Sequence, residues 1–437
     1  MKINDRKNTI FYLLQQDGPF ATLETPLTSR TFTPNARKRS AAIHRNGLTT
    51  KYRIIRNQIQ ELLDISSFRE IYELMSDHSR KKQVARRAYM LIGNMFGIEG
   101  NEREIISRVN SYSRTADAVI RYLQRQTMAP YSSYLDMTNE VDIITSPVDL
   151  LLMIFDDRYH LKARFEAKRK LILMNLAGSI DQRERETDIE AKFAEFLNFL
   201  NEFVWSHKTR IGELEPAYLL SSHDRESFAC SSLKILSPEE AKNIVLTERQ
   251  KLTLIKRRMF EINGRKIPVY VSIRKKSPEA KVLKLLRKGE ENPAVAVDDE
   301  LGLMGVVDSL KEVKLFHKHL TQSAVQAHSF MTLEDISDSL HGQRYQISNE
   351  GSCPQTSMLK FFARMGGMRI EFIIHTNKSY LNYIYQRDVS HHEYEVKRII
   401  DSGAADLLFP KELYDLDMQE VKKELIHRYR HMIEWTN

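Results

Sequence analysis

The stretch that decides the fold is Leu-Thr-Leu-Ile-Lys-Arg-Arg-Met-Phe-Glu-Ile-Asn-Gly-Arg-Lys-Ile-Pro-Val-Tyr-Val-Ser-Ile-Arg, residues 252–274. Two strand-like runs, 252–261 and 266–274, flank Asn263-Gly264. Asn-Gly is the strongest short-range signal for a two-residue β-hairpin, because both turn residues must adopt a positive φ. The sequence therefore predicts a pair of antiparallel strands at this point.

Strand and helix patterns alternate on both sides of this hairpin. A capping box, Ser237-Pro-Glu-Glu240, predicts the start of a short helix. Further strands are expected at 294–298, 305–307, 358–362 and 368–375, and helices at 279–287, 309–320, 392–402 and 419–435. Strands interleaved with helices are typical of an α/β or α+β domain, which we place at 237–437.

The first half of the chain has a different pattern. Residues 1–50 mix Thr, Ser, Pro and Arg without a clear period, so we interpret them as an arm or linker. From Lys51 onward, apolar residues recur three and four positions apart, as in Ile55, Ile59 and Leu62. We therefore expect an all-helical domain at 51–236, and an α+β fold for the whole chain.

Composition is that of an ordinary globular protein. The chain has 437 residues, 42% hydrophobic and 28% charged, which is enough for two or three domains. Cys230 and Cys353 form neither a disulfide framework nor a zinc motif, which favours a reducing compartment. The N-terminus lacks a secretory core, and no apolar run approaches the ~18 residues of a membrane span. We expect a cytoplasmic protein with no membrane association.

Positive charge is concentrated in one segment. Residues 251–288 contain 13 Lys and Arg against 2 Asp and Glu, whereas the whole chain has a net charge of +8. Such a segment indicates a polyanionic ligand, although a solvated basic face would have the same composition.

Residues suited to phosphoryl chemistry lie in and after this segment. The cations Arg274, Lys276, Lys281 and Lys284 follow a predicted strand into a helix, and the carboxylates Asp298, Asp299 and Glu371 lie in or beside later strands. Cations bind phosphate oxygens and carboxylates bind a divalent metal, which are the needs of phosphoryl transfer. Each residue also has a structural alternative: the helix can be solvated, the Asp pair can cap a loop, and a strand Glu can pair with a neighbouring cation.

The order of these motifs resembles the RelA/SpoT-type (p)ppGpp synthetases over about residues 265–400. The resemblance rests on Arg274-Lys-Lys-Ser277 with the two following lysines, on Asp299-Glu-Leu-Gly-Leu-Met304, on Ile370-Glu-Phe-Ile-Ile-His-Thr376, and on Ser390-His-His-Glu-Tyr-Glu-Val-Lys-Arg398. It implies a nucleotidyltransferase-like mixed sheet flanked by helices. It also implies the family's reaction, transfer of pyrophosphate from ATP to a nucleotide 3′-hydroxyl, which makes the alarmone of the bacterial stringent response.

The resemblance assigns roles to individual residues. Asp299 and Glu371 would be catalytic and would hold Mg²⁺ with help from Asp298, and Glu371 would accept the proton of the attacking hydroxyl. The four cations Arg274, Lys276, Lys281 and Lys284 would bind the phosphates of ATP.

The sequence departs from the family pattern where the acceptor binds. Met304 and His375 stand where the family has Arg, and residues 348–357 replace the loop whose Tyr stacks on the acceptor base. Tyr345, Lys360 and His375 are the remaining candidates for acceptor binding.

Three functions therefore remain open: an alarmone pyrophosphokinase, an enzyme that pyrophosphorylates RNA such as a tRNA 3′ end, and a catalytically degenerate nucleotide- or RNA-binding regulator. The helical half would regulate the other half or bind a protein partner.

Overall fold

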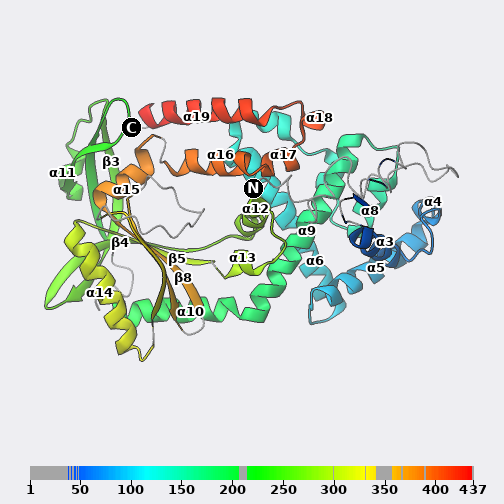
Figure 1. The fold of residues 1–437 in the computed structure, drawn as a ribbon, viewed down its shortest axis with the longest axis horizontal. Coiled ribbons are helices and arrows are strands. Elements are labelled where there is room, and N and C mark those ends of the chain that lie inside the picture. The colour runs from blue at the N-terminus through cyan, green and yellow to red at the C-terminus, as the bar shows by residue number, and fades with distance from the viewer. Residues whose placement is uncertain are drawn as a thin grey trace. The chain divides into compact units, whose positions relative to one another are not determined.

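Helices and one large sheet make up the described part of this chain, which a computed structural model shows as a mixed α+β fold (Figure 1). The structure describes residues 38, 41, 44, 45, 47 and 49–435, with gaps at 206–213, 299, 330, 341–356, 366–367 and 388–389. The chain divides into two units, each built from separate stretches of sequence. The helical unit comprises 1–186, 277–297 and 398–422, and the sheet unit comprises 187–276, 298–397 and 423–437.

The predicted hairpin is confirmed. Strands β3 (Gln250–Ile262) and β4 (Arg265–Lys275) pair antiparallel, with Ile262 opposite Arg265. The two residues between them have φ of 52° at Asn263 and 72° at Gly264. Both values lie in the left-handed region, which Asn tolerates and Gly adopts without steric cost, so the local sequence explains the turn.

This hairpin lies inside an eight-stranded sheet of order β2-β1-β3-β4-β5-β8-β7-β6. All neighbouring strands pair antiparallel except β5 and β8, which are parallel. The other strands are β1 (Glu215–His223), β2 (Cys230–Leu236), β5 (Leu301–Val307), β6 (Thr332–Asp338), β7 (Leu359–Met365) and β8 (Met368–Thr376).

Strands β1 and β2 lie within 51–236, which we predicted to be all helical, so that prediction is wrong for residues 215–236. The burial of β1 alternates as expected for a strand, but two of its inward positions are Ser221 and His223. Because these buried positions are polar, apolar residues do not alternate with polar ones along the segment, and the sequence pattern does not indicate a strand.

The two faces of the sheet are covered differently. One face packs against α10 (Ile189–Phe199), the π-helical turn η5 (Leu200–Val204) and α14 (Leu310–Gln326), which bury residues such as Phe260, Phe316 and Phe372 (Figure 1). The other face packs in part against α15 (Asn377–Tyr385) through Tyr380 and Leu381. The remaining helices with residues in this unit are α11 (Pro238–Lys242), α16 (His391–Asp401) and α19 (Met418–Trp435).

The helical unit begins with consecutive helices up to α9. These are α3 (Thr49–Leu63), α4 (Glu70–Ser76), α5 (His78–Met95), α6 (Glu102–Tyr122), η3 (Leu123–Thr127), η4 (Ala129–Leu135), α7 (Asn139–Ile143), α8 (Pro147–Phe155) and α9 (Leu161–Thr187). Later sequence adds α12 (Pro278–Lys288), α13 (Ala294–Val297), α17 (Ala404–Leu408) and α18 (Lys411–Tyr414). None of the helices in the described ranges is long and apolar enough to cross a membrane.

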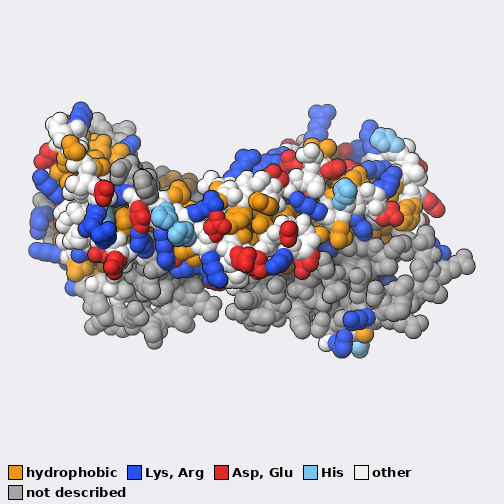
Figure 2. Space-filling model, turned by 90° about the horizontal axis from the view of Figure 1, so that it is seen from above, with side chains coloured by type: hydrophobic (Ala, Val, Ile, Leu, Met, Phe, Trp, Pro, Cys, Tyr) orange, Lys and Arg blue, Asp and Glu red, His pale blue; other side chains and the backbone are white. Residues whose placement is uncertain are grey.

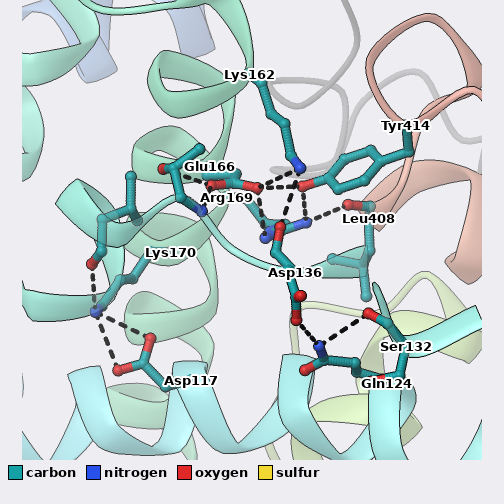
Figure 3. A network of polar contacts seen from close by, with 12 residues as sticks. Asp117, Gln124, Ser132, Asp136, Lys162, Glu166, Arg169, Lys170, Leu408 and Tyr414 are labelled. Carbon is teal, nitrogen blue, oxygen red and sulfur yellow. Dashed lines mark hydrogen bonds and ion pairs between the residues drawn. The ribbon is translucent and has the colours of Figure 1, made fainter. Parts of the chain in front are cut away.

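A buried polar network joins the α17–α18 segment to α9 within this unit (Figure 3). The Tyr414 hydroxyl donates to Glu166 Oε1 at 2.7 Å, and Arg169 Nη1 donates to the Leu408 carbonyl at 2.6 Å and to the Tyr414 hydroxyl at 2.8 Å. Burial raises the pKa of Tyr414, which keeps its hydroxyl a donor. Because buried charges are stable only with partners, this network fixes the segment against α9.

Replacing Gly264 tests the turn that starts the sheet. Gly264→Ala should lower the stability of the chain by about 1–2 kcal/mol, since a Cβ is disfavoured in left-handed backbone. The midpoint of urea unfolding measures this change. Asn263→Gly is the matched control and should unfold close to wild type, because glycine adopts the same φ freely. Equal midpoints for Gly264→Ala and wild type would contradict the turn geometry.

Candidate functional site

A polar site lies on the face of the sheet formed by β4, β5, β8 and β7. Strand pairing places Arg274 opposite Gly302, and Gly302 opposite Glu371. Directly paired residues of neighbouring strands project to the same side. The flanking residues Ile370 and Phe372 project to the opposite side and are fully buried in the core, so the alternation of β8 turns Glu371 to the polar face.

The carboxylate of Glu371 contacts two cations. Arg274 Nη2 donates to Glu371 Oε2, and Lys360 Nζ lies 2.8 Å from Oε1. The side chains of Glu371 and Lys360 are 8% and 10% exposed, whereas that of Arg274 is 49% exposed. The site is thus a nearly buried carboxylate beside one guanidinium that remains open to solvent.

Gly302 leaves room for the contact between Arg274 and Glu371. Arg274 on β4 must cross β5 to reach Glu371 on β8. An ideal Cβ at Gly302 would lie 2.9 Å from Arg274 Nε, closer than real contacts allow. A glycine within a strand often marks such a close approach, but the sequence alone does not say which side chain approaches.

Tyr383 of α15 borders the same site. Burial raises its pKa most, while Arg274 lowers it and Glu371 raises it, so the phenol lies within electrostatic range of both. One face of its ring stacks on His375, with centroids 5.5 Å apart, and the ring of His391 lies 5.7 Å away. Sequence reasoning missed Tyr383, because nothing in the helix 377–385 distinguishes it from its neighbouring tyrosines.

His375, a predicted acceptor-binding residue, is 1% exposed and lies beneath Tyr383. Its Nδ1 lies 3.3 Å from the carbonyl oxygen of Ser357 and 3.3 Å from the hydroxyl of Ser379. Burial lowers the pKa of His375 to about 4. His375 is therefore a neutral packing residue in this structure, whereas Lys360, predicted for the same role, lies in the site itself.

The depressed pKa of His375 predicts a loss of stability in acid. Between pH 6.5 and 4 the unfolded chain binds a proton at this histidine that the folded chain does not. Stability should therefore fall as the pH falls through this window, with His375 contributing about 3 kcal/mol at most. Urea unfolding at pH 7.0, 5.5 and 4.5 should show a smaller loss in His375→Gln than in wild type. Equal losses in both proteins would contradict the assignment.

The four predicted phosphate-binding cations do not come together in one unit. Arg274 and Lys276 belong to the sheet unit, while Lys281 and Lys284 belong to α12 of the helical unit. Lys281 is 1% exposed and its Nζ contacts Glu184, and Lys284 is also buried. The helix pattern showed that both lysines lie on α12 but not that they project inward.

Replacing Lys281 distinguishes packing from ligand binding. Lys281→Met should lower stability by about 3 kcal/mol, because breaking a buried ion pair is costly, and should leave nucleotide affinity unchanged. Lys288→Met on the exposed side of the same helix is the control and should be neutral. Urea unfolding and ATP titration measure the two effects. Unchanged stability with lost ATP affinity would restore the phosphate-binding role.

The predicted metal ligands are only partly described. Asp299 and Tyr345 lie outside the described residues. Asp298 is exposed at the end of α13 (Ala294–Val297), where we predicted a strand. That prediction is wrong because Asn292 accepts a hydrogen bond from the Ala294 amide and Pro293 occupies the first turn, which together start a helix.

The described residues do not fit a magnesium site. Both oxygens of Glu371 already contact cations, and Asp298 is exposed at the end of α13. Within the described ranges, no group of three or more His, Cys, Asp or Glu side chains is placed to hold a metal ion. Glu300, a carboxylate that sequence reasoning did not single out, is 1% exposed and lies 3.7 Å from Lys275 Nζ.

Some cations of segment 251–288 are paired with carboxylates. Besides Arg274 and Lys281, Arg257 Nη2 lies 2.9 Å from Glu215, and Lys275 contacts Glu190. Among the described side chains on the face drawn in Figure 2, Lys and Arg are interspersed with Asp and Glu. Part of the local excess of positive charge is therefore paired with carboxylates, while other cations of the segment, such as Lys256 and Lys266, are exposed.

The chain matches no protein-family model, no curated protein and no solved structure. The function must therefore be argued from the site itself.

Proposed function

We propose that this polar face binds the phosphate chain of ATP and that the chain transfers pyrophosphate from ATP to the 3′-hydroxyl of a nucleotide or RNA. The observation that supports the proposal is Glu371 held between Arg274 and Lys360. Cations for phosphate oxygens and a carboxylate for a hydroxyl proton then lie within one small area. A nucleotidyltransferase-like fold and a cytoplasmic location belong to the same proposal.

Each side chain has a distinct task. The half-exposed guanidinium of Arg274 can contact two phosphate oxygens at once, and Lys360 adds a compact positive charge. The acceptor 3′-oxygen forms a bond to the β-phosphorus of ATP, and the bond from that phosphorus to the oxygen bridging to the α-phosphate breaks. AMP leaves with the bridging oxygen, and Glu371 accepts the proton of the hydroxyl.

One observation favours a second candidate, a nucleotide- or RNA-binding regulator without catalysis. Both Glu371 oxygens contact cations, and Met304 supplies no charge on the neighbouring strand. A carboxylate held in this way orients the cations for binding even where no proton is transferred. Binding and turnover must therefore be measured separately.

Glu371→Gln separates the two candidates. The variant should keep ATP affinity within a few-fold of wild type and lose at least about 100-fold in turnover, the usual contribution of a positioned base. The assay follows label from γ-³²P-ATP to GDP, GTP, ADP or bulk tRNA, with and without Mg²⁺. Glu215→Gln is the matched control, since Glu215 also lies on a strand of the sheet and contacts an arginine.

Label transferred by wild type and by Glu215→Gln, but not by Glu371→Gln, would support the enzyme and name its acceptor. Turnover in Glu371→Gln equal to wild type would exclude the assigned role of Glu371. ATP binding by wild type without transfer to any acceptor would favour the regulator.

A further inference from the structure

A second group of arginines lies on the sheet beyond Lys360. Arg364 Nε on β7 lies 2.5 Å from Glu334 Oε1 on β6. Arg369 on β8 donates from Nε to Glu334 Oε2 at 3.0 Å and from Nη2 to Asp335 Oδ2 at 2.8 Å. Hydrogen bonds from Arg364 and Arg369 lower the pKa of Glu334, which keeps it ionised as the partner of both.

These arginines share the face of the sheet that carries Glu371. Phe362 pairs with Glu371, and Arg364 pairs with Arg369, two residues along each strand. Side chains at positions two apart project to the same side. The guanidinium of Arg369 also lies 3.6 Å from the ring centroid of Phe362, which confirms that the two share that side.

The two arginines differ in exposure, and this difference identifies the one that can bind a ligand. Arg369 is 21% exposed and contacts two carboxylates and an aromatic ring. Arg364 is 56% exposed and, among the described side chains, contacts the carboxylate of Glu334. A guanidinium has five N–H donors, so Glu334 orients Arg364 while other donors face solvent.

Arg364 and Arg274 are directed to different parts of this face. The side chain of Arg274 crosses β5 to Glu371 on β8, whereas that of Arg364 contacts Glu334 on β6. Glu371 and Glu334 both pair with Phe362, so they lie level with each other on strands two spacings apart, or about 10 Å. A second substrate placed beside a triphosphate at Arg274 would therefore reach Arg364.

We propose that Arg364 binds a phosphate group of the acceptor. The acceptor is then a nucleotide or nucleic acid with a phosphate of its own, either a nucleoside 5′-diphosphate or an RNA strand, and not a free nucleoside. The name acceptor rests on the proposed function, but the phosphate-binding role of Arg364 does not. An arginine that only stabilised the edge strand β6 would make no difference to ligand affinity.

The test compares fluorescent ligands with and without phosphate. Wild-type protein should bind a labelled nucleoside 5′-diphosphate or a labelled five-nucleotide RNA, and the unphosphorylated nucleoside should compete at least tenfold less well. Arg364→Gln should weaken binding of the phosphorylated ligand about tenfold, the effect of one lost charge-assisted hydrogen bond. Fluorescence anisotropy measures affinity, and the ligand that is weakened identifies the source of the phosphate.

Two further variants show whether weaker binding results from the loss of the Arg364 contact or from misfolding. Arg364→Lys keeps a cation beside Glu334 but loses bidentate geometry, so it should fold and show an intermediate loss. Arg428→Gln is the matched control, since Arg428 is 54% exposed and lies 2.6 Å from one carboxylate, Glu424, on α19. It should bind every ligand as wild type does.

Three results would overturn the proposal: wild type binding neither phosphorylated ligand, Arg364→Gln binding both as tightly as wild type, or the free nucleoside competing equally. If label transfer is absent but Arg364→Gln still loses phosphate-dependent binding, the proposed reaction fails and this site stands. If transfer occurs and Arg364→Gln has an unchanged KM for the acceptor, the site fails and the reaction stands.

Discussion

The ion pairs of Glu371 are the constraint on which the sheet unit depends. An ionised carboxylate that is 8% exposed is costly unless cations and hydrogen-bond donors surround it. Here one cation comes from β7 and the other crosses β5 from β4. A slip of one residue in the pairing of β8 would turn Glu371 toward the core that holds Phe372. Because an unpaired carboxylate in that core is costly, the ion pairs of Glu371 favour the observed register of the central strands.

The sequence predicted those turns, helix starts and strands whose formation depends on residues that are close together in the chain. Asn263-Gly264 predicted the hairpin because its backbone preference acts within two residues. Ser237 predicted the start of α11, where its side chain and that of Glu240 form the expected capping box. The strand patterns at 358–362 and 368–375 likewise correspond to β7 and β8.

Features that depend on distant parts of the chain were not predictable in the same way. Arg274, Lys360 and Glu371 meet only because the strand order β4-β5-β8-β7 joins segments up to 97 residues apart. Lys281 was predicted to bind phosphate, but its partner Glu184 precedes it by 97 residues. In β1, polar residues face inward and hide the strand period. The spacing of residues in the sequence specifies which side chains share a face of a helix or strand. Tertiary packing decides which other residues that face contacts.

The basic segment 251–288 illustrates the same limit for charge. Alternation along the strands sends its cations to opposite sides of the sheet, where Arg258 lies 5.7 Å from the ring of Trp205 while Arg274 reaches Glu371. An excess of charge along a sequence therefore does not by itself make a basic surface. What the fold provides instead is a small number of arginines whose positions are fixed by carboxylates.

In the proposed reaction, an arginine held by a carboxylate would affect both the binding of phosphate and the transfer of the hydroxyl proton. A guanidinium already held by a carboxylate loses little conformational freedom when a phosphate binds to it. The phosphate must, however, compete with that carboxylate for the same donors. Under the proposed function, ATP would draw Arg274 toward its phosphates and release Glu371 Oε2, while Oε1 would keep its ion pair with Lys360. In this proposal, the oxygen released by substrate binding would be the one that accepts the hydroxyl proton, so the ion pair between Arg274 and Glu371 would limit the reactivity of Glu371 until ATP binds.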